Sequence, residues 1–205
     1  GLFVTFEGID KSGKTTQVRL LTDALTRSGC AVVSTTQPGG SSLGAEIWRL
    51  IRDPRHFGRM APLTELMLFA ADRAQSVREV ILPALDAGKV VVCDRYTDST
   101  VAYQGYGRGL NLDTILALND AATEGLVPDL TIFIDISVEE ARRRGLGEAI
   151  NRMEMEQGSF FERVREGYLR IAASDRKRVV VFNGCDTTER ISENVRAVVE
   201  AALKR

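Results

Sequence analysis

The sequence has little of what disulfide frameworks and metal sites require. Its 205 residues include one histidine and three cysteines, and the cysteines do not have the spacing of a metal site. An odd number of cysteines also excludes a fully paired disulfide framework, so we expect reduced, packed thiols in a cytoplasmic protein. The only histidine, His56, has no catalytic partner close to it in the sequence, and we expect it on a surface loop.

Excess charge and long apolar runs are also lacking. Lysine and arginine number 27 against 28 aspartates and glutamates, which leaves a net charge of −1 and no general attraction to nucleic acid or to acidic membranes. No apolar run approaches the ~20 residues of a membrane span, and no basic and then apolar leader precedes the first predicted strand. We therefore expect no membrane span, no signal peptide and no nucleic-acid partner.

What the sequence does have is an alternation of short β-branched runs with helical patterns. This alternation predicts a single α/β domain over residues 1–205, with a parallel sheet covered by helices on both faces. Five strands are expected, at residues 2–6, 31–35, 89–93, 130–134 and 179–182. Helices are expected at residues 14–28, 43–51, 63–86, 112–124, 138–144, 158–174 and 188–203. Pro83 should distort or end the third helix.

A glycine-rich loop directly follows the first predicted strand. The segment from Gly8 to Thr15 fits the pattern G-x-x-x-x-G-K-[ST], and a strand before it and a helix after it can direct backbone N–H groups at a polyphosphate. Lys14 can reach the β- and γ-phosphates, and the Thr15 hydroxyl can bind Mg²⁺. A chance match in a glycine-rich turn is the alternative. The expected residues of the triphosphate site are Gly8, Ile9, Asp10, Lys11, Ser12, Gly13, Lys14, Thr15 and Thr16.

A carboxylate and an arginine, Asp94 and Arg95, lie at the carboxyl end of the third predicted strand. A carboxylate at this edge of a sheet can hold Mg²⁺ or its water, and the adjacent arginine can bind phosphate. A structural ion pair is the alternative. Asp135 also ends an apolar strand, but a helix follows at once, so we favour capping of that helix by Asp135 or Ser137.

Segments spread over nearly the whole chain resemble one known family. The stretch DRYTDSTVAYQG at 94–105 resembles the D-R-[YFH]-x-x-S-x-x-A-Y-Q-G signature of bacterial thymidylate kinases. LFAADRAQ at 68–75, PGG at 38–40 and PDL at 128–130 are similar to further segments of that family. The resemblance implies a homodimeric P-loop NTPase fold, with a five-stranded parallel sheet in a three-layer α/β/α arrangement. It also implies Mg²⁺-assisted transfer of the γ-phosphoryl group of ATP to dTMP, giving dTDP and ADP.

The resemblance implies roles for single residues as well. Phe69 would stack on the thymine, and Arg73 and Gln104 would bind the edge of the base. Tyr103 would lie beneath the deoxyribose, and Asp10 would approach the 3′-hydroxyl. Without the resemblance, Phe69 would be assigned to the core, and Asp10 equally well to stabilising the loop. The expected substrate-binding residues are Asp10, Phe69, Arg73, Arg95, Ser99, Tyr103 and Gln104, and the expected metal ligands are Thr15 and Asp94.

Basic residues after the fourth predicted strand resemble the family's lid, a mobile segment that closes over the donor phosphates. The expected lid spans about residues 142–157, and its arginines are Arg142, Arg143, Arg144 and Arg152. A solvated helix face is the alternative. Lys11 competes with the lid for the transferred phosphoryl group, and we expect the lid to dominate because a guanidinium can bind two oxygens at once. The expected catalytic residues are Lys14, Arg95, Arg143 and Arg152.

The chain departs from the family pattern on the acceptor side. Thr36 and Trp48 stand where the family usually has arginine, and Gln37 stands where it has glutamate. Each lost charge-assisted bond to the acceptor could cost ~1.5–3 kcal/mol. Two alternatives therefore stay open: a nucleotide-binding switch or regulatory module without dTMP turnover, and a kinase for another nucleoside monophosphate. The sequence contains no N-K-x-D guanine signature that would support a switch.

Overall fold

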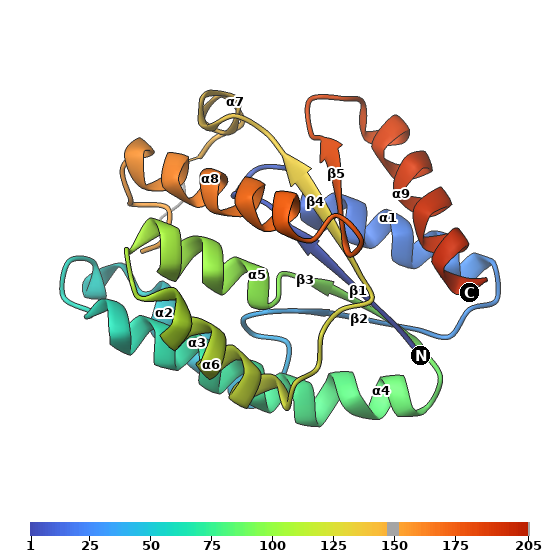
Figure 1. The fold of residues 1–205 in the computed structure, drawn as a ribbon, viewed down its shortest axis with the longest axis horizontal. Coiled ribbons are helices and arrows are strands. Elements are labelled where there is room, and N and C mark those ends of the chain that lie inside the picture. Colours follow the sequence, from blue (N-terminus) through green and yellow to red (C-terminus); the bar gives the residue numbers. More distant parts are fainter. Residues whose placement is uncertain (147–151, 205) are drawn as a thin grey trace.

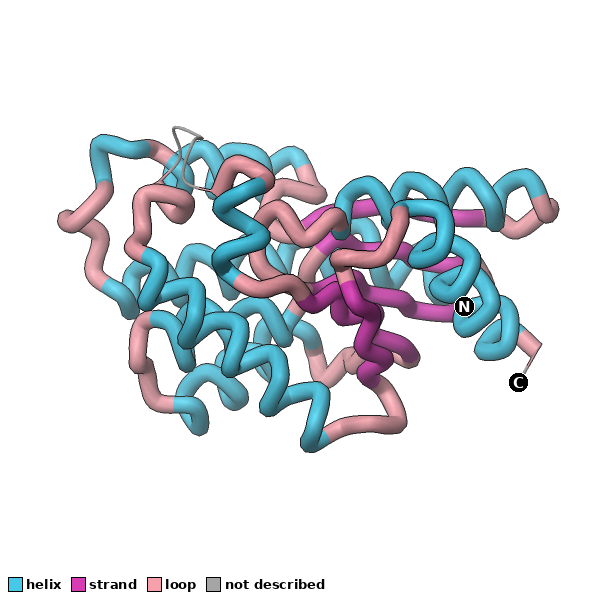
Figure 2. Tube along the Cα trace, turned by 90° about the horizontal axis from the view of Figure 1, so that it is seen from above, coloured by secondary structure: helices cyan, strands magenta, loops and turns pink. Residues whose placement is uncertain are grey.

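A five-stranded parallel sheet with the order β2-β3-β1-β4-β5 forms the centre of the computed structural model, which describes residues 1–146 and 152–204. The strands are β1 (Leu2–Glu7), β2 (Val32–Thr36), β3 (Val90–Asp94), β4 (Leu130–Asp135) and β5 (Val179–Asn183). Each end lies within one residue of its predicted position. Helices flank the sheet (Figure 1), and the strands lie between them when the molecule is seen from above (Figure 2). The predicted five-stranded α/β/α fold is confirmed.

Helices fill the connections between the strands (Figure 1). The α-helices are α1 (Lys14–Arg27), α2 (Ser42–Arg52), α3 (Pro62–Ser76), α4 (Leu82–Asp86), α5 (Thr97–Thr100), α6 (Leu112–Thr123), α7 (Val138–Arg143), α8 (Gly158–Ser174) and α9 (Thr188–Leu203). The other helical segments in residues 1–146 and 152–204 are a 3-10 turn, η1 (Pro54–His56), and two π-helical turns, η2 (Val77–Ile81) and η3 (Val101–Gly107). The turn η3 and the short α5 were not predicted.

The predicted helix over residues 63–86 is three consecutive segments, α3, η2 and α4. In η2 the N–H of Leu82 donates to the carbonyl of Val77, five residues back. Pro83, which has no N–H to donate, follows directly after this π-helical turn, as the second residue of α4. The proline therefore distorts the helical path without ending it.

The apolar strands pack against helices on both faces, as a buried parallel sheet requires. On one face, Val4 and Phe6 of β1 belong to a buried cluster with α1 and α9. On the other face, Phe3 packs with Val77 and Ile81 of η2. Among the described residues, no helix is both long enough and apolar enough to cross a membrane.

The glycine-rich segment at 105–109 is explained by close helix packing. A Cβ on Gly107 would come within 2.7 Å of Phe160, and a Cβ on Gly167 would come within 2.6 Å of Tyr106. Both contacts join η3 to α8, so the glycines let the two elements approach. This packing places the residues of η3 beside the carboxyl ends of the strands.

The sheet register brings three chain segments to one edge. Asp94, the last residue of β3, lies opposite Phe6 of β1 and Thr36 of β2. The loop that follows β1 therefore lies beside the residues that end β2 and β3. Ligands of open α/β sheets bind at this edge, outside the carboxyl ends of the strands.

Candidate active site

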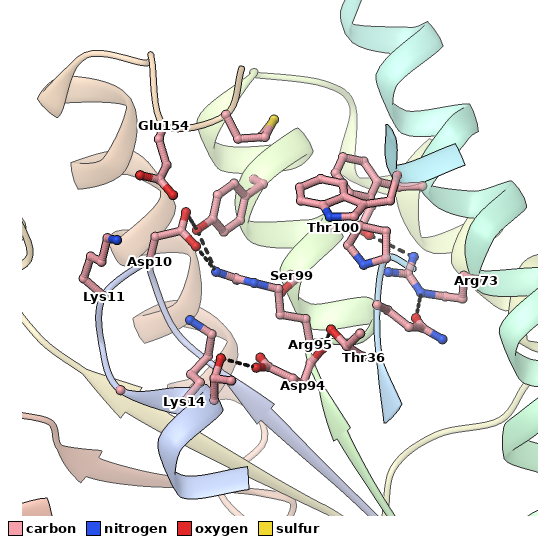
Figure 3. A pocket seen from close by; sticks show the side chains of 18 of the residues that line it. Asp10, Lys11, Lys14, Thr36, Arg73, Asp94, Arg95, Ser99, Thr100 and Glu154 are labelled. Carbon is pink, nitrogen blue, oxygen red and sulfur yellow. Dashed lines mark hydrogen bonds and ion pairs between the residues drawn. The ribbon is translucent and has the colours of Figure 1, made fainter. Parts of the chain in front are cut away.

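One cavity of about 550 Å³ joins most of the predicted site residues. Figure 3 shows Lys11 and Lys14 on one side, Arg73 and Thr100 on the other, and Arg95 between them. We call these sides the phosphate end, formed by the loop from Gly8 to Thr15, and the base end, formed by α3 and η3. The predicted residues that line the cavity are Asp10, Lys11, Gly13, Lys14, Thr15, Thr16, Phe69, Arg73, Asp94, Arg95, Ser99, Tyr103 and Gln104.

The phosphate end is a closed loop around Lys14. Gly8 and Gly13 adopt positive φ angles of 140° and 98°, and a Cβ on Gly8 would come within 2.4 Å of the Ile134 carbonyl oxygen. Lys14 Nζ donates to the carbonyl of Ile9 at 2.9 Å from inside the loop. Within the described part of the chain, no side chain caps the N-terminus of α1, so its first N–H groups are available to an anion.

The groups around Lys14 shift its pKa in opposite directions. Burial, together with the neighbouring Arg95, lowers the pKa of Lys14 to about 8, although Asp94 and Asp10 act in the opposite direction. A polyphosphate beside the ammonium would stabilise its charged form. We therefore expect nucleotide binding near this pH to be accompanied by proton uptake.

Thr15 and Asp94 meet at the floor of the cavity. The Thr15 hydroxyl donates to Asp94 Oδ2 at 2.6 Å. The described residues contain no group of three or more His, Cys, Asp or Glu side chains that could bind a metal by themselves. Mg²⁺ at a nucleotide site usually takes only one or two protein ligands and completes its shell with phosphates and water. The pair of Thr15 and Asp94 fits this requirement.

Arg95 connects the loop to the rest of the cavity. Its backbone is held at a φ of 72°, a conformation that costs a non-glycine residue free energy and often occurs at functional sites. Its guanidinium donates to the Gly8 carbonyl at 3.0 Å, to Asp10 at 2.6 Å and to the Tyr103 hydroxyl at 3.2 Å. Burial opposes the charge on Asp10, but Arg95 and Lys14 hold the pKa of Asp10 below its usual value. The carboxylate of Asp10 is thus ionised and fixed beside Tyr103.

Glu7, which was not predicted as a site residue, holds the chain segment that follows Arg95. Its carboxylate accepts hydrogen bonds from the backbone N–H of Tyr96 at 2.7 Å, from Ser99 Oγ at 2.6 Å and from the Tyr168 hydroxyl at 3.0 Å. Burial and the nearby Asp98 raise the pKa of Glu7 to about 7. Glu7 ends an apolar strand just as Asp94 does, and that signal was present in the sequence.

The base end contains a buried arginine held by neutral groups. Arg73 donates to Gln37 Oε1 at 3.0 Å, to Thr100 Oγ1 at 2.8 Å, to Asn119 Oδ1 at 2.9 Å and to the Tyr96 carbonyl at 3.0 Å. A guanidinium has five N–H groups, so these four bonds leave one for the cavity that Arg73 lines. Burial lowers the pKa of Arg73, yet arginine stays charged.

The three departures from the family pattern lie together on one wall of the cavity. Thr36, Gln37 and Trp48 all line it. The Thr36 hydroxyl donates to the Asp94 carbonyl at 3.3 Å. Gln37 is buried, and its Nε2 has no partner among the described residues. Thr36 and Gln37 are neighbours in the sequence, but the sequence alone could not place Trp48 in the same cavity.

The two lid arginines that we expected to be catalytic do not line the cavity in this structure. Arg143 is 75% exposed and pairs with Glu140 at 2.8 Å, and Arg152 is buried and pairs with Glu65 at 2.7 Å. Each of the two side chains is held by a carboxylate that does not line the cavity. Arg144 does line the cavity, and it donates to the Gly184 carbonyl at 2.8 Å. Residues 147–151 of the expected lid lie outside the described residues.

The alternative that we favoured for Asp135 agrees with the structure in part. Ser137 caps α7, because its Oγ accepts from the Glu140 N–H at 3.1 Å. Asp135 instead forms two hydrogen bonds with Arg165, at 2.7 and 2.8 Å. Asp135 is therefore held away from a metal-binding role by an ion pair.

The sequence and the fold are similar to those of known proteins. A family model described as thymidylate kinase matches residues 6–195. A thymidylate kinase of Nostoc punctiforme is 45% identical over 206 residues, covering 100% of this chain and 98% of that protein. A thymidylate kinase of Desulfovibrio desulfuricans is 46% identical over 212 residues, covering 100% and 97%. The crystal structure of the thymidylate kinase from Ehrlichia chaffeensis has a TM-score of 0.79 and 34% identity, and the match covers 97% of this chain and 98% of that one.

Proposed function

Because the chain belongs to the thymidylate kinase family, we propose that its cavity holds ATP at the phosphate end and dTMP at the base end. The enzyme transfers the γ-phosphoryl group of ATP to dTMP and releases dTDP and ADP. The observation that carries the assignment of the two ends is the single cavity, which the phosphate loop and the hydrogen-bonding groups of Arg73 and Gln104 line together. Such an arrangement lets donor and acceptor meet without a further domain.

Catalysis at the phosphate end rests on positioning and on charge, as phosphoryl transfer requires. Lys14 would bind the β- and γ-phosphates, and Arg95 would bind the phosphate of the acceptor. Asp10, fixed by Arg95 and bonded to Tyr103 at 3.1 Å, would face the sugar. Thr15 and Asp94 would hold Mg²⁺, which would neutralise charge on the donor phosphates when bound.

The base end presents a pattern that suits a thymine or uracil ring. Arg73 has one N–H left for the cavity, and thymine offers its O4 as an acceptor. Gln104 supplies an amide for the neighbouring N3–H. Phe69 lines the same end and offers an aromatic face for stacking. The ring of Tyr103 would fill the space that a 2′-hydroxyl requires.

The lid, at about residues 142–157, also stays a proposal. Arg144, Met153 and Glu154 come from its described part and line the cavity. Their place in the cavity lining supports a segment that closes over the donor phosphates and excludes water from them. Arg144 is the lid arginine that closure would bring nearest to the donor phosphates, because it already lines the cavity.

We assign a homodimer to the face formed by α2, α3 and α6, which lie together in Figure 1. Large apolar side chains are exposed on all three helices, among them Leu50 of α2, Met67 of α3 and Leu116 of α6, at 46%, 56% and 55%. A second copy would cover them, since monomers rarely expose such patches. Met67→Glu should convert the dimer to a monomer in light scattering, and an unchanged mass would contradict this face.

We also propose a cytoplasmic location. All three cysteines, which lie in the described part of the chain, are free thiols, as is usual for proteins of a reducing compartment. Fractionation of the native cells would test the proposal directly.

The decisive experiment offers the pure protein Mg-ATP and a panel of nucleoside monophosphates. We expect dTMP to give the highest kcat/KM. Preferential turnover of another monophosphate would overturn the substrate assignment. Tight triphosphate binding without transfer to any acceptor would favour a nucleotide-binding switch instead.

A further inference from the structure

A buried carboxylate lies directly behind the base end of the cavity. Glu65 of α3 is 1% exposed and does not line the cavity itself. Its Oε1 accepts from Gln104 Nε2 at 2.7 Å and from Arg108 Nε at 3.1 Å. Its Oε2 accepts from Arg108 Nη2 at 3.0 Å and forms an ion pair with Arg152 Nη2 at 2.7 Å. Gln104 therefore stands between Glu65 and the cavity.

The charge on Glu65 decides which end of the Gln104 amide faces it. Burial disfavours the ionised carboxyl, but the hydrogen bonds from Arg108 and Gln104 and the charge of Arg152 hold the pKa of Glu65 below its usual value. An ionised carboxylate can only accept hydrogen bonds. Gln104 must therefore turn its NH₂ group toward Glu65.

The amide oxygen of Gln104 is then the polar atom left for the ligand. No described residue donates a hydrogen bond to Gln104 Oε1, while Gln104 lines the cavity. An oxygen in this place accepts from a donor such as the N3–H of thymine. Cytosine carries an unprotonated N3 at the same ring position, and two acceptors facing each other repel.

We propose that Glu65 is a positioning residue that sets base specificity by fixing the orientation of the Gln104 amide. The inference rests on the proposed function, because it takes the base end as the site of the acceptor base. Glu65 would act without touching the substrate. Replacing its acceptor-only carboxylate by a group that can also donate would free the amide to flip.

Glu65→Gln makes that replacement with almost no change of shape. A flipped Gln104 would present NH₂ to the cytosine N3, so we expect the ratio of kcat/KM for dTMP to that for dCMP to fall about tenfold or more. Arg73 still faces the 4-position of the ring, and some preference for dTMP should remain. Glu65→Asp keeps the charge beside Arg108 and Arg152 but withdraws it from Gln104. Glu65→Asp should therefore also lower the ratio of kcat/KM for dTMP to that for dCMP. If Glu65→Gln does not fold, Glu65→Asp takes its place in the experiment.

Two further variants separate orientation from a general structural effect. Gln104→Leu removes the amide, and in this background Glu65→Gln should leave the dTMP to dCMP ratio almost unchanged. Glu156→Gln is the matched control, because Glu156 also pairs with Arg108 but has no contact with Gln104. It should leave the ratio at the wild-type value.

The experiment measures kcat/KM for dTMP and for dCMP with Mg-ATP. The proteins compared are the wild type, Glu65→Gln, Glu65→Asp, Glu156→Gln, Gln104→Leu and the double variant with Glu65→Gln and Gln104→Leu. An unchanged ratio in folded Glu65→Gln and Glu65→Asp would overturn the role of Glu65. So would an equal shift in the Gln104→Leu background. If the wild-type enzyme does not phosphorylate dTMP, the proposed function itself is overturned. This outcome is distinct from turnover of dTMP with an unchanged ratio, which overturns only the role of Glu65.

Discussion

The two ends of the cavity are built in different ways. The phosphate end consists of one short loop and the last residues of neighbouring strands, so the backbone of the sheet places its groups. The base end consists of side chains from helices, and these are held by other side chains such as Gln37 around Arg73 and Glu65 behind Gln104. The phosphate end should therefore depend on few residues, each with a large effect. The base end should depend on many residues that do not touch the ligand.

The largest effect is expected from Lys14→Ala at the phosphate end. The variant removes the ammonium that the loop holds at 2.9 Å from the Ile9 carbonyl, and with it a charge aimed at the transferred group. Losing one such preorganised donor costs on the order of 10²–10³-fold in kcat. Steady-state rates at saturating ATP and dTMP measure the loss, with circular dichroism as the control for folding. Near-normal turnover would remove Lys14 from the mechanism.

Arg73→Ala tests whether the base end acts on the acceptor alone. The variant removes a charged donor from the cavity and leaves Gln37, Thr100 and Asn119 without their partner. Loss of a charge-assisted bond should raise the KM for dTMP by roughly 10- to 100-fold. The KM for ATP should change much less. Equal effects on both substrates would mean that the base end has been placed wrongly.

The phosphate end has one side-chain network, formed by Glu7 with Ser99 and Tyr168, and in this it resembles the base end. A pH experiment on Glu7 tests this network. The pKa of Glu7 is raised from 4.5 to about 7 on folding, so the folded protein binds the proton more tightly. The stabilisation is complete below the unfolded pKa and is lost as the pH rises through about 7. The free energy of unfolding of the wild type should fall relative to Glu7→Gln by on the order of 1–3 kcal/mol over this range.

Urea unfolding of both proteins on either side of this range measures the difference. Titrating groups that do not interact with Glu7 contribute equally to the two proteins, so they cancel when the two curves are subtracted. A wild-type-minus-variant difference that stays constant with pH would show that the pKa of Glu7 is not raised.

The same contrast explains what could be predicted from the sequence. The phosphate end follows from one contiguous motif and from Asp94 at a strand end, because local order fixes both. At the base end, Phe69 alone would have been assigned to the core, and only the family resemblance indicated its role. Glu65 could not be found, since its partners Gln104 and Arg108 are 39 and 43 residues away in the sequence. Such a contact exists only after the helices have packed.

The lid arginines also show that a sequence does not reveal contacts that form only when the chain has folded. A run of charges predicts a basic segment, but it does not say which carboxylate each arginine will meet. Arg143 pairs with Glu140, three residues away, and Arg152 pairs with Glu65 across the molecule. Arg144 was only one of three neighbouring arginines in the sequence. The turn that ends α7 places it at the cavity.

The smallest effect is expected from Arg143→Ala. Comparing this variant with Arg144→Ala and Lys11→Ala decides which cation assists phosphoryl transfer. Arg143 is 75% exposed and its partner Glu140 lies outside the cavity, so the variant should keep kcat within about twofold of wild type. Arg144→Ala removes a guanidinium that lines the cavity and should lower kcat by about tenfold or more. Lys11→Ala should fall between the two, because an ammonium offers one compact charge where a guanidinium can bind two oxygens.

All three variants are compared at saturating ATP and dTMP, so that binding does not hide the effect on transfer. Arg143→Ala is the matched control for Arg144→Ala, since it removes the same group one position earlier and both arginines bond to Glu140. A crippled Arg143→Ala beside an active Arg144→Ala would show that lid closure exchanges the two arginines before the phosphoryl group moves. A crippled Lys11→Ala with both arginine variants active would place the catalytic cation in the phosphate loop.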